Sequence, residues 1–305
     1  MKQIKIGLVN GLNYYDYKDL INNFLNELHI SYITSNKTTK KTIENGKKLL
    51  VDECCLSLKI FFGHICDLKD KCDYILVIRS PSIERDEFMC INFYALYDLA
   101  NNIFPDKIID LNIDLNHNIN LKKSFINLGK KLGFNQKKCS CAFDKAYNMD
   151  LKNRDYKYNE VLQLLKSSKK KILLIGHAYN LFDNYISSDI KKILKDLNVE
   201  ILLSCYLEGI KSDRYKSISK DINWSKNIKL LNVIMEFRNY IDGIILISTF
   251  PCAIDSLVNE MIIRKSNIPI LDLTIDEIND IGSITKRIEE FLDNIKMEKK
   301  YEYKN

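Results

Sequence analysis

Short runs of β-branched and other apolar residues alternate with longer amphipathic segments in the N-terminal part of the chain. The apolar runs predict buried strands, and segments whose apolar positions recur every three or four residues predict helices. Strands are expected at Ile4–Val9, Ile30–Thr34, Tyr74–Ile78 and Lys107–Leu111, with a helix at Tyr17–Leu28 and a mainly helical segment at Thr42–Asp70. This alternation is typical of a parallel sheet that helices cover on both faces.

The same alternation returns in the C-terminal part. Strands are expected at Lys171–Ile175, Val199–Leu203, Gly243–Ser248 and Ile268–Leu273, and helices at Asn227–Tyr240, Asp255–Arg264 and Ser283–Asn294. We therefore predict two Rossmann-like three-layer α/β domains with mostly parallel sheets, at 1–135 and 171–305, joined by a polar bridging segment at 136–170. Ligands of such folds bind at the carboxyl ends of strands, so the domains are expected to face a central cleft that holds the site.

The composition narrows the class of protein. Of 305 residues, 46% are hydrophobic and 28% charged, with 4 prolines and 10 glycines, which excludes collagen-like and disordered chains. No apolar run reaches the roughly 18 residues of a membrane span, and the first residues read as a strand, so we expect a cytoplasmic protein without a membrane partner. The net charge of +6 comes mostly from scattered lysines, which argues against a nucleic-acid partner.

The common motifs of nucleotide-binding and hydrolytic α/β proteins do not occur in the sequence. No GxGxxG or GxxxxGK[ST] follows a predicted strand, and no GxSxG elbow is present. The chain is therefore expected to bind no nucleotide through these motifs and to perform no serine-hydrolase chemistry.

The 9 cysteines are the most unusual feature of the composition. In a reducing cytoplasm they are expected to be core thiols, metal ligands or a nucleophile rather than disulfides. Structural zinc sites favour CxxC pairs, which this chain lacks, whereas an iron–sulfur cluster accepts thiolates at varied spacings. Cys252 lies between a predicted strand and a predicted helix, where helix N–H groups stabilise an anionic ligand.

Several segments, in a consistent order, resemble one known family. Residues 52–59 (Asp-Glu-Cys-Cys-Leu-Ser-Leu-Lys) with Gly63-His64 resemble the E-x-C-x-P-x-K and G-H signature of acyl-CoA dehydratase activase-related proteins. Residues 73–79, with Cys90 after them, are similar to the family's DYI-IPR strand with Cys-Pro-Lys. Residues 176–183 resemble its G-[HR]-P-Y-N-x-x-D, and residues 250–256 resemble its F-x-C-G-P-D-S. Residues 276–277 and 287–291 resemble its D-E and R-x-E-A-F elements. The family is similar in turn to subunits of 2-hydroxyacyl-CoA dehydratases and to double-cubane cluster proteins.

The resemblance implies one [4Fe-4S] cluster held by Cys55, Cys90 and Cys252, which would then meet across the cleft; an [8Fe-9S] double-cubane cluster is the alternative. It implies that a separate ATP-hydrolysing activator of the actin-like kinase fold supplies low-potential electrons, for reduction or dehydration of a small substrate. The chain would be an ATP-dependent reductase component or an acyl-CoA dehydratase-like lyase. The alternative is that the chain is a non-catalytic cluster-carrying or binding subunit. The resemblance also implies a homodimer or a pair with a related subunit.

Four residues around these cysteines have two interpretations each. His64 lies on an apolar helix face, where it is either a hydrogen-bonded core histidine or a group beside the cluster. His177, Tyr179 and Asp183 follow a predicted strand, where they line the cleft or cap the next helix. The remaining cysteines are expected to be small core residues: Cys54, Cys66, Cys72, Cys139, Cys141 and Cys205. A double cubane would need further ligands, such as Cys54 or Cys66.

The sequence departs from the family pattern beside each matched cysteine. Ser57 replaces a proline, Ile91-Asn92 replaces Pro-Lys, and Ala253-Ile254 replaces Gly-Pro. The thiols remain, but the turns around them are expected to differ. Because neighbouring residues of a helix point about 100° apart, only one of the adjacent cysteines 54 and 55 is expected to face the cleft, and the motif selects the second.

Overall fold

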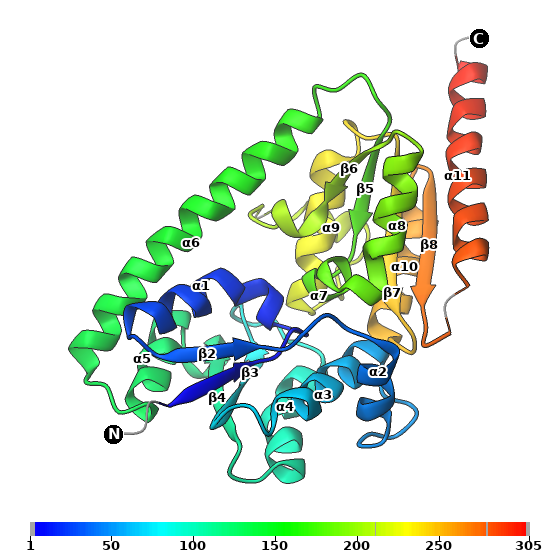
Figure 1. Cartoon of the computed structure of the whole chain (residues 1–305). Helices are drawn as coiled ribbons and strands as arrows, with labels where there is room; N and C mark the ends of the chain where they lie inside the picture. The colour runs from blue at the N-terminus through cyan, green and yellow to red at the C-terminus, as the bar shows by residue number, and fades with distance from the viewer. Residues whose placement is uncertain (1–3, 211, 279, 303–305) are drawn as a thin grey trace. The chain divides into compact units, whose positions relative to one another are not determined.

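The computed structural model of the chain describes residues 4–210, 212–278 and 280–302, without the side chains of 296–302. It divides into two compact units, Met1–Asp155 with Asn223–Ser225, and Tyr156–Ile222 with Lys226–Asn305. Each unit contains a four-stranded parallel sheet with helices on its faces (Figure 1). The predicted α/β class with two Rossmann-like three-layer domains is therefore confirmed, while the boundaries near residues 135 and 171 and the central cleft stay predictions.

The sheet of the first unit has the strand order β2-β1-β3-β4, and all neighbouring strands are parallel. Its strands are β1 (Lys5–Leu8), β2 (Ser31–Thr34), β3 (Tyr74–Ser82) and β4 (Ile108–Asp114). The chain leaves β1 toward β2 on one side and leaves β3 toward β4 on the other. The carboxyl ends of β1 and β3 therefore form a topological switch point, where folds of this class bind ligands.

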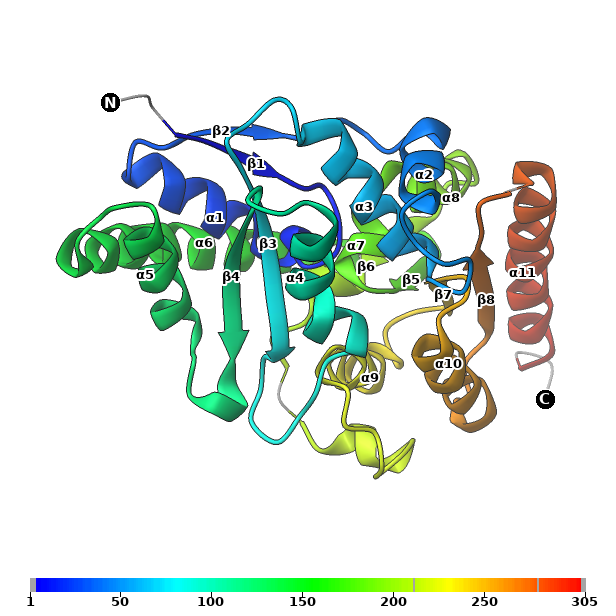
Figure 2. The same cartoon turned by 90° about the horizontal axis from the view of Figure 1, so that it is seen from below.

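Helices cover both faces of this sheet (Figure 1 and Figure 2). The helices are α1 (Tyr14–Glu27), α5 (Leu121–Lys131) and α6 (Gln136–Leu164) on one side, with α2 (Lys40–Lys47), α3 (Leu56–Leu68) and α4 (Ile91–Ile103) on the other, and a short turn η1 (Leu115–His117) follows β4. Phe24, Phe125 and Phe143 bring α1, α5 and α6 together over the strands. These buried rings explain why helices with polar outer faces adhere to the sheet.

The segment predicted as mainly helical over Thr42–Asp70 contains two helices, and the expectation that Cys54 and Cys55 lie on a helix is wrong. Helix α2 ends at Lys47 and α3 begins at Leu56, so Cys55 precedes a helix instead of lying inside one. The reason is that α2 packs directly on α3: a Cβ atom at Gly63 would overlap the carbonyl oxygen of Thr42. A chain whose two halves pack on each other so closely has to turn between them.

The second unit repeats the plan with the strand order β6-β5-β7-β8, again all parallel. Its elements are β5 (Lys171–Ile175), α7 (Ala178–Phe182), α8 (Asn184–Asp196), β6 (Glu200–Leu203), η2 (Ser204–Tyr206), η3 (Arg214–Ser217), α9 (Ser225–Phe237), β7 (Gly243–Thr249), α10 (Ala253–Lys265), β8 (Ile270–Ile275) and α11 (Ile281–Glu302). Helix α11 packs on α8, and right-handed connections place α9 and α10 on the opposite face. The switch point of this sheet lies between β5 and β7.

The bridging segment predicted at 136–170 is mostly the single helix α6. Its first turns pack on the core of the first unit through Cys139, Phe143 and Ala146, all buried. The chain passes from the first unit to the second within this helix, after Asp155. Neither α6 nor any other helix in the described part of the chain is long and apolar enough to cross a bilayer.

Candidate functional site

Each of the three cysteines singled out by the motifs is the residue immediately before a helix. Cys55 precedes α3, Cys90 precedes α4 and Cys252 precedes α10. The first N–H groups of a helix have no partner within the helix, and the aligned peptide dipoles place a partial positive charge there. In the part of the chain that the structure describes, none of the other six cysteines immediately precedes a helix. The three cysteines therefore share a position at which a helix N-terminus stabilises a negatively charged ligand.

In the first unit the N-termini of α3 and α4 lie together. Asn92, the second residue of α4, directs its side-chain amide at the sulfur of Cys55, with 3.9 Å between Nδ2 and Sγ. Because Cys90 precedes the same helix, both cysteines lie in one region at the carboxyl ends of the strands. Sequence reasoning noted Asn92 only as a departure from the family pattern, and the contact arises from tertiary packing.

In the second unit a buried carboxylate joins the loops that follow β5 and β7. Asp255 is 6% exposed and accepts hydrogen bonds from His177 Nε2 at 2.9 Å and from Asn227 Nδ2 at 3.1 Å. Burial alone raises the pKa of Asp255, but the charge and hydrogen bond of His177, with the bond from Asn227, hold the pKa below its ordinary value. Asp255 is therefore ionised at neutral pH.

Tyr179 and Lys226 extend this network. The ring of Tyr179 stacks on His177 with 5.1 Å between centroids, and the Lys226 ammonium lies 5.5 Å from the Tyr179 centroid. All three side chains are buried. An imidazole and an ammonium group at the carboxyl ends of β5 and β7 favour negative charge in a ligand bound there.

Asp183 has a capping role. Its carboxylate accepts hydrogen bonds from the backbone N–H groups of Tyr185 at 2.8 Å and Ile186 at 3.2 Å, the first turn of α8. This matches the capping interpretation of the residue. That Asp183 lines the cleft stays a prediction, as it does for His177 and Tyr179.

His64 lies in the core of the first unit. Its side chain is fully buried, and Nε2 lies 2.9 Å from Oγ1 of Thr38. Burial lowers the pKa of His64 from 6.5 to about 4, so the imidazole is neutral at physiological pH. The geometry corresponds to a hydrogen-bonded core histidine.

This burial predicts a pH dependence of stability. Between pH 6.5 and about 4 the unfolded chain binds a proton on His64 that the folded chain does not. The contribution of this residue to the free energy of unfolding is complete above pH 6.5, and up to about 3 kcal/mol is lost as the pH falls to 4. In urea unfolding at successive pH values, the stability difference between wild type and His64→Gln should shrink toward pH 4. A difference independent of pH would contradict the assignment.

Cysteine thiolates are the side chains that hold iron–sulfur clusters in proteins. No group of three or more His, Cys, Asp or Glu side chains able to hold a metal ion occurs among the described residues. Cys55 and Cys90 belong to the first unit and Cys252 to the second. That the three meet stays a prediction.

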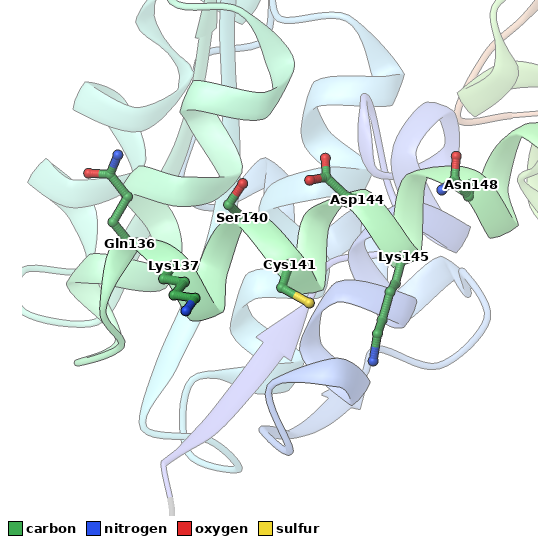
Figure 3. Close-up of a pocket in the computed structure, with 7 residues that line it drawn as sticks. All are labelled: Gln136, Lys137, Ser140, Cys141, Asp144, Lys145 and Asn148. Atoms are coloured by element: carbon green, nitrogen blue, oxygen red, sulfur yellow. The ribbon is translucent and has the colours of Figure 1, made fainter.

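A shallow hollow of about 690 Å³ lies along α6 (Figure 3). Its lining residues recur every three or four positions between Gln136 and Asn148, and therefore form one exposed face of the helix. Two of them are paired with neighbouring elements: Asp144 with Lys122 and Lys145 with Glu27. The hollow is a solvated helix surface and contains none of the predicted site residues.

A comparison with known protein families finds a family model that matches most of the chain. The model described as "CoA enzyme activase uncharacterised domain" matches residues 5–206, a range that includes Cys55, Cys90 and His177 but ends before Cys252. No curated protein matches the sequence.

Similar solved structures share little sequence. They include the SBP FpvC from Pseudomonas aeruginosa in complex with Mn2+ (13% identity, 96% of both chains, TM-score 0.30) and the laminin-binding adhesin of Streptococcus agalactiae (11% identity, 97% of both chains, TM-score 0.29). A third is the C-terminal domain of glucosamine-fructose-6-phosphate aminotransferase from Francisella tularensis (10% identity, 97% of this chain and 85% of that chain, TM-score 0.26). Likenesses at these scores carry no argument about ligands or activity.

Proposed function

Because this chain belongs to the family described as CoA enzyme activase uncharacterised domain, we propose that it is an iron–sulfur protein of the type found in 2-hydroxyacyl-CoA dehydratases and double-cubane cluster proteins. Cys55, Cys90 and Cys252 are its proposed thiolate ligands. One [4Fe-4S] cluster per chain matches three thiolates, whereas a double cubane needs more ligands or a second subunit.

The placement of the cysteines carries this proposal. The three proposed ligands all precede helices of 13 residues, where the helix N-terminus stabilises a thiolate and an anionic cluster. Three other cysteines show the opposite environment: burial raises the thiol pKa of Cys66, Cys72 and Cys139. This difference supports the choice of Cys55, Cys90 and Cys252 over the three cysteines whose pKa burial raises.

The proposed chemistry is electron transfer to a small acyl substrate. A bound cluster would supply one-electron redox chemistry at low potential. The chain itself contributes the Asn92 amide, which donates to the sulfur of Cys55, and the basic side chains of His177 and Lys226, which would stabilise negative charge developing on a thioester carbonyl. The electron would come from a separate ATP-hydrolysing activator, since this chain carries no nucleotide-binding loop motif.

Anaerobic purification and reconstitution with iron and sulfide test the proposal. The expected result is a brown protein with about four irons per chain and an EPR signal on reduction. Reduction by an activator with ATP would support the catalytic role, and a cluster that no activator reduces would favour a cluster-carrying subunit. A colourless, iron-free protein after reconstitution would overturn the proposal.

Substitution of the two adjacent cysteines tests the choice of ligand. Cys55→Ser should lose most of the iron, because Cys55 precedes α3 and contacts Asn92. Cys54→Ser should keep nearly all of it, because Cys54 lies one residue further from the helix. Iron and sulfide are counted per chain after identical anaerobic reconstitution. The reverse order of iron loss would move the ligand by one residue.

A further inference from the structure

The first turn of helix α9 places a buried ammonium group beside a buried hydroxyl group. Ser225 and Lys226 are the first two residues of this 13-residue helix. The side chain of Ser225 is fully buried, and Lys226 is 9% exposed. The first N–H groups of the helix, which have no partner within it, lie in the same turn. Positive charge and hydrogen-bond donors are therefore concentrated at this end of α9.

The hydroxyl group of Ser225 is a buried donor without a partner. In the part of the chain that the structure describes, no hydrogen-bond partner lies within reach of Ser225 Oγ. The backbone N–H of the same residue does have one, the carbonyl oxygen of Phe88 at 3.0 Å. An unpaired buried hydroxyl group costs free energy, so such groups are rare in folded proteins. A bound ligand with acceptor oxygens would satisfy this one.

Lys226 is held at the end of the sheet where folds of this class bind ligands. Its ammonium group lies 5.5 Å from the ring centroid of Tyr179, which belongs to α7 directly after β5. Asn227, the next residue of α9, donates its side-chain amide to Asp255 at 3.1 Å and is not counted among the donors for a ligand. Because Lys226 is buried, solvent screens its charge weakly, and its attraction for an anion is strong.

We infer that the first turn of α9 binds a small oxyanion, a carboxylate or phosphate group that is charged before it binds. Lys226 is the counter-ion, and the Ser225 hydroxyl group donates a hydrogen bond. Both kinds of oxyanion offer the acceptor oxygens that an ammonium group, a hydroxyl group and a helix N-terminus bind together. The proposed function places near Lys226 only a charge that develops on a carbonyl group. A permanently charged group goes beyond that function, and its binding needs no cluster.

The test is isothermal titration calorimetry of the metal-free full chain with inorganic phosphate and, separately, with succinate. Constant ionic strength removes the general effect of salt. We expect saturable binding of at least one probe, at one site per chain. Binding of phosphate alone would identify a phosphoryl group as the natural ligand group, and binding of succinate alone a carboxylate. A folded wild-type chain that binds neither probe would overturn the inference.

Lys226→Met should weaken binding of the probe about tenfold or more, because methionine retains most of the side-chain length without the charge. Lys229→Met is the matched control. Lys229 is a half-buried lysine three residues further along the same helix, so its substitution removes the same charge away from the first turn. Its affinity should stay within about twofold of the wild type. An equal loss in both variants would overturn the inference, because net charge alone would then explain the binding.

Ser225→Ala provides a second test in case Lys226→Met does not fold. Without a probe, loss of an unpaired hydroxyl group should leave the free energy of unfolding unchanged or slightly higher, whereas affinity for the probe should fall about threefold or more. Lower stability with unchanged affinity would contradict the assignment, because the hydroxyl group would then serve the fold. An iron-free chain that binds a probe would overturn the proposed function alone, and an iron-loaded chain whose metal-free form binds neither would overturn this inference alone.

Discussion

Cys252→Ser is expected to remove most of the iron from the anaerobically reconstituted chain and to shift the potential of any cluster that remains. Serine is close in size to cysteine, but its hydroxyl is a much weaker ligand than a thiolate. Loss of hydrogen-bond partners around metal ligands already costs about 10- to 100-fold in affinity, and loss of the ligand itself should cost at least as much. Cys252 also lies at the N-terminus of α10, whose free N–H groups stabilise an anionic ligand. Iron analysis and EPR-monitored potentiometry measure both effects.

Cys205→Ser is the control for this substitution. Cys205 belongs to the same unit and is partly buried, but it lies in the short turn η2 after β6 and matches no motif. Its variant should keep the iron content, the spectrum and the potential of the wild type. If Cys205→Ser bleaches the protein while Cys252→Ser leaves the spectrum intact, the ligand assignment is wrong.

The strands were accessible to sequence reasoning because parallel strands covered on both faces consist of nearly continuous apolar residues. The strand predicted at Gly243–Ser248 is β7, which ends one residue later. Helix starts were harder to locate. Helix α10 begins at Ala253, two residues before the predicted start. This start was missed because the residue before the helix is Cys252, which is not among the preferred capping residues.

Helix α6 shows a second limit of the pattern. The N-terminal part of this helix packs on a core through residues such as Phe143 and Ala146, residues 151–160 are exposed or half-buried, and Val161 is buried again near the end of the helix. A helix without a continuous apolar stripe gives a weak periodic signal. The sequence therefore indicated a polar connection but not its helical conformation.

The candidate site was predictable in its residue types but not in its contacts. The motif that contains Cys252 also contains Asp255 three positions later, so the local spacing was a usable signal. The bond between Asp255 and His177 joins residues 78 positions apart. It depends on the adjacency of β5 and β7, which no local pattern determines. The contact between Asn92 and Cys55 likewise depends on how α3 and α4 pack on their sheet.

Gly63→Ala is expected to destabilise the first unit strongly, although alanine normally favours a helix by about 1 kcal/mol over glycine. A Cβ at Gly63 would overlap the carbonyl oxygen of Thr42, and a Cβ at Gly46 would overlap that of Lys59. These are backbone atoms of the facing helix, so no side-chain rotation relieves the overlap, and α3 has to move away from α2. We expect a loss of about 3 kcal/mol in the free energy of unfolding, measured by urea denaturation of the metal-free chain.

The same movement should displace Cys55, because this residue lies at the start of α3, and iron content after reconstitution should fall together with stability. Gly209→Ala is the matched control: a Cβ at Gly209 meets no atom within 4 Å, so the change in stability should stay within about 0.5 kcal/mol. Equal stabilities for the two variants would mean that α2 and α3 do not cross as closely as described. If Gly63→Ala is destabilised but keeps the wild-type iron content, the position of Cys55 does not depend on the packing of α3 on α2.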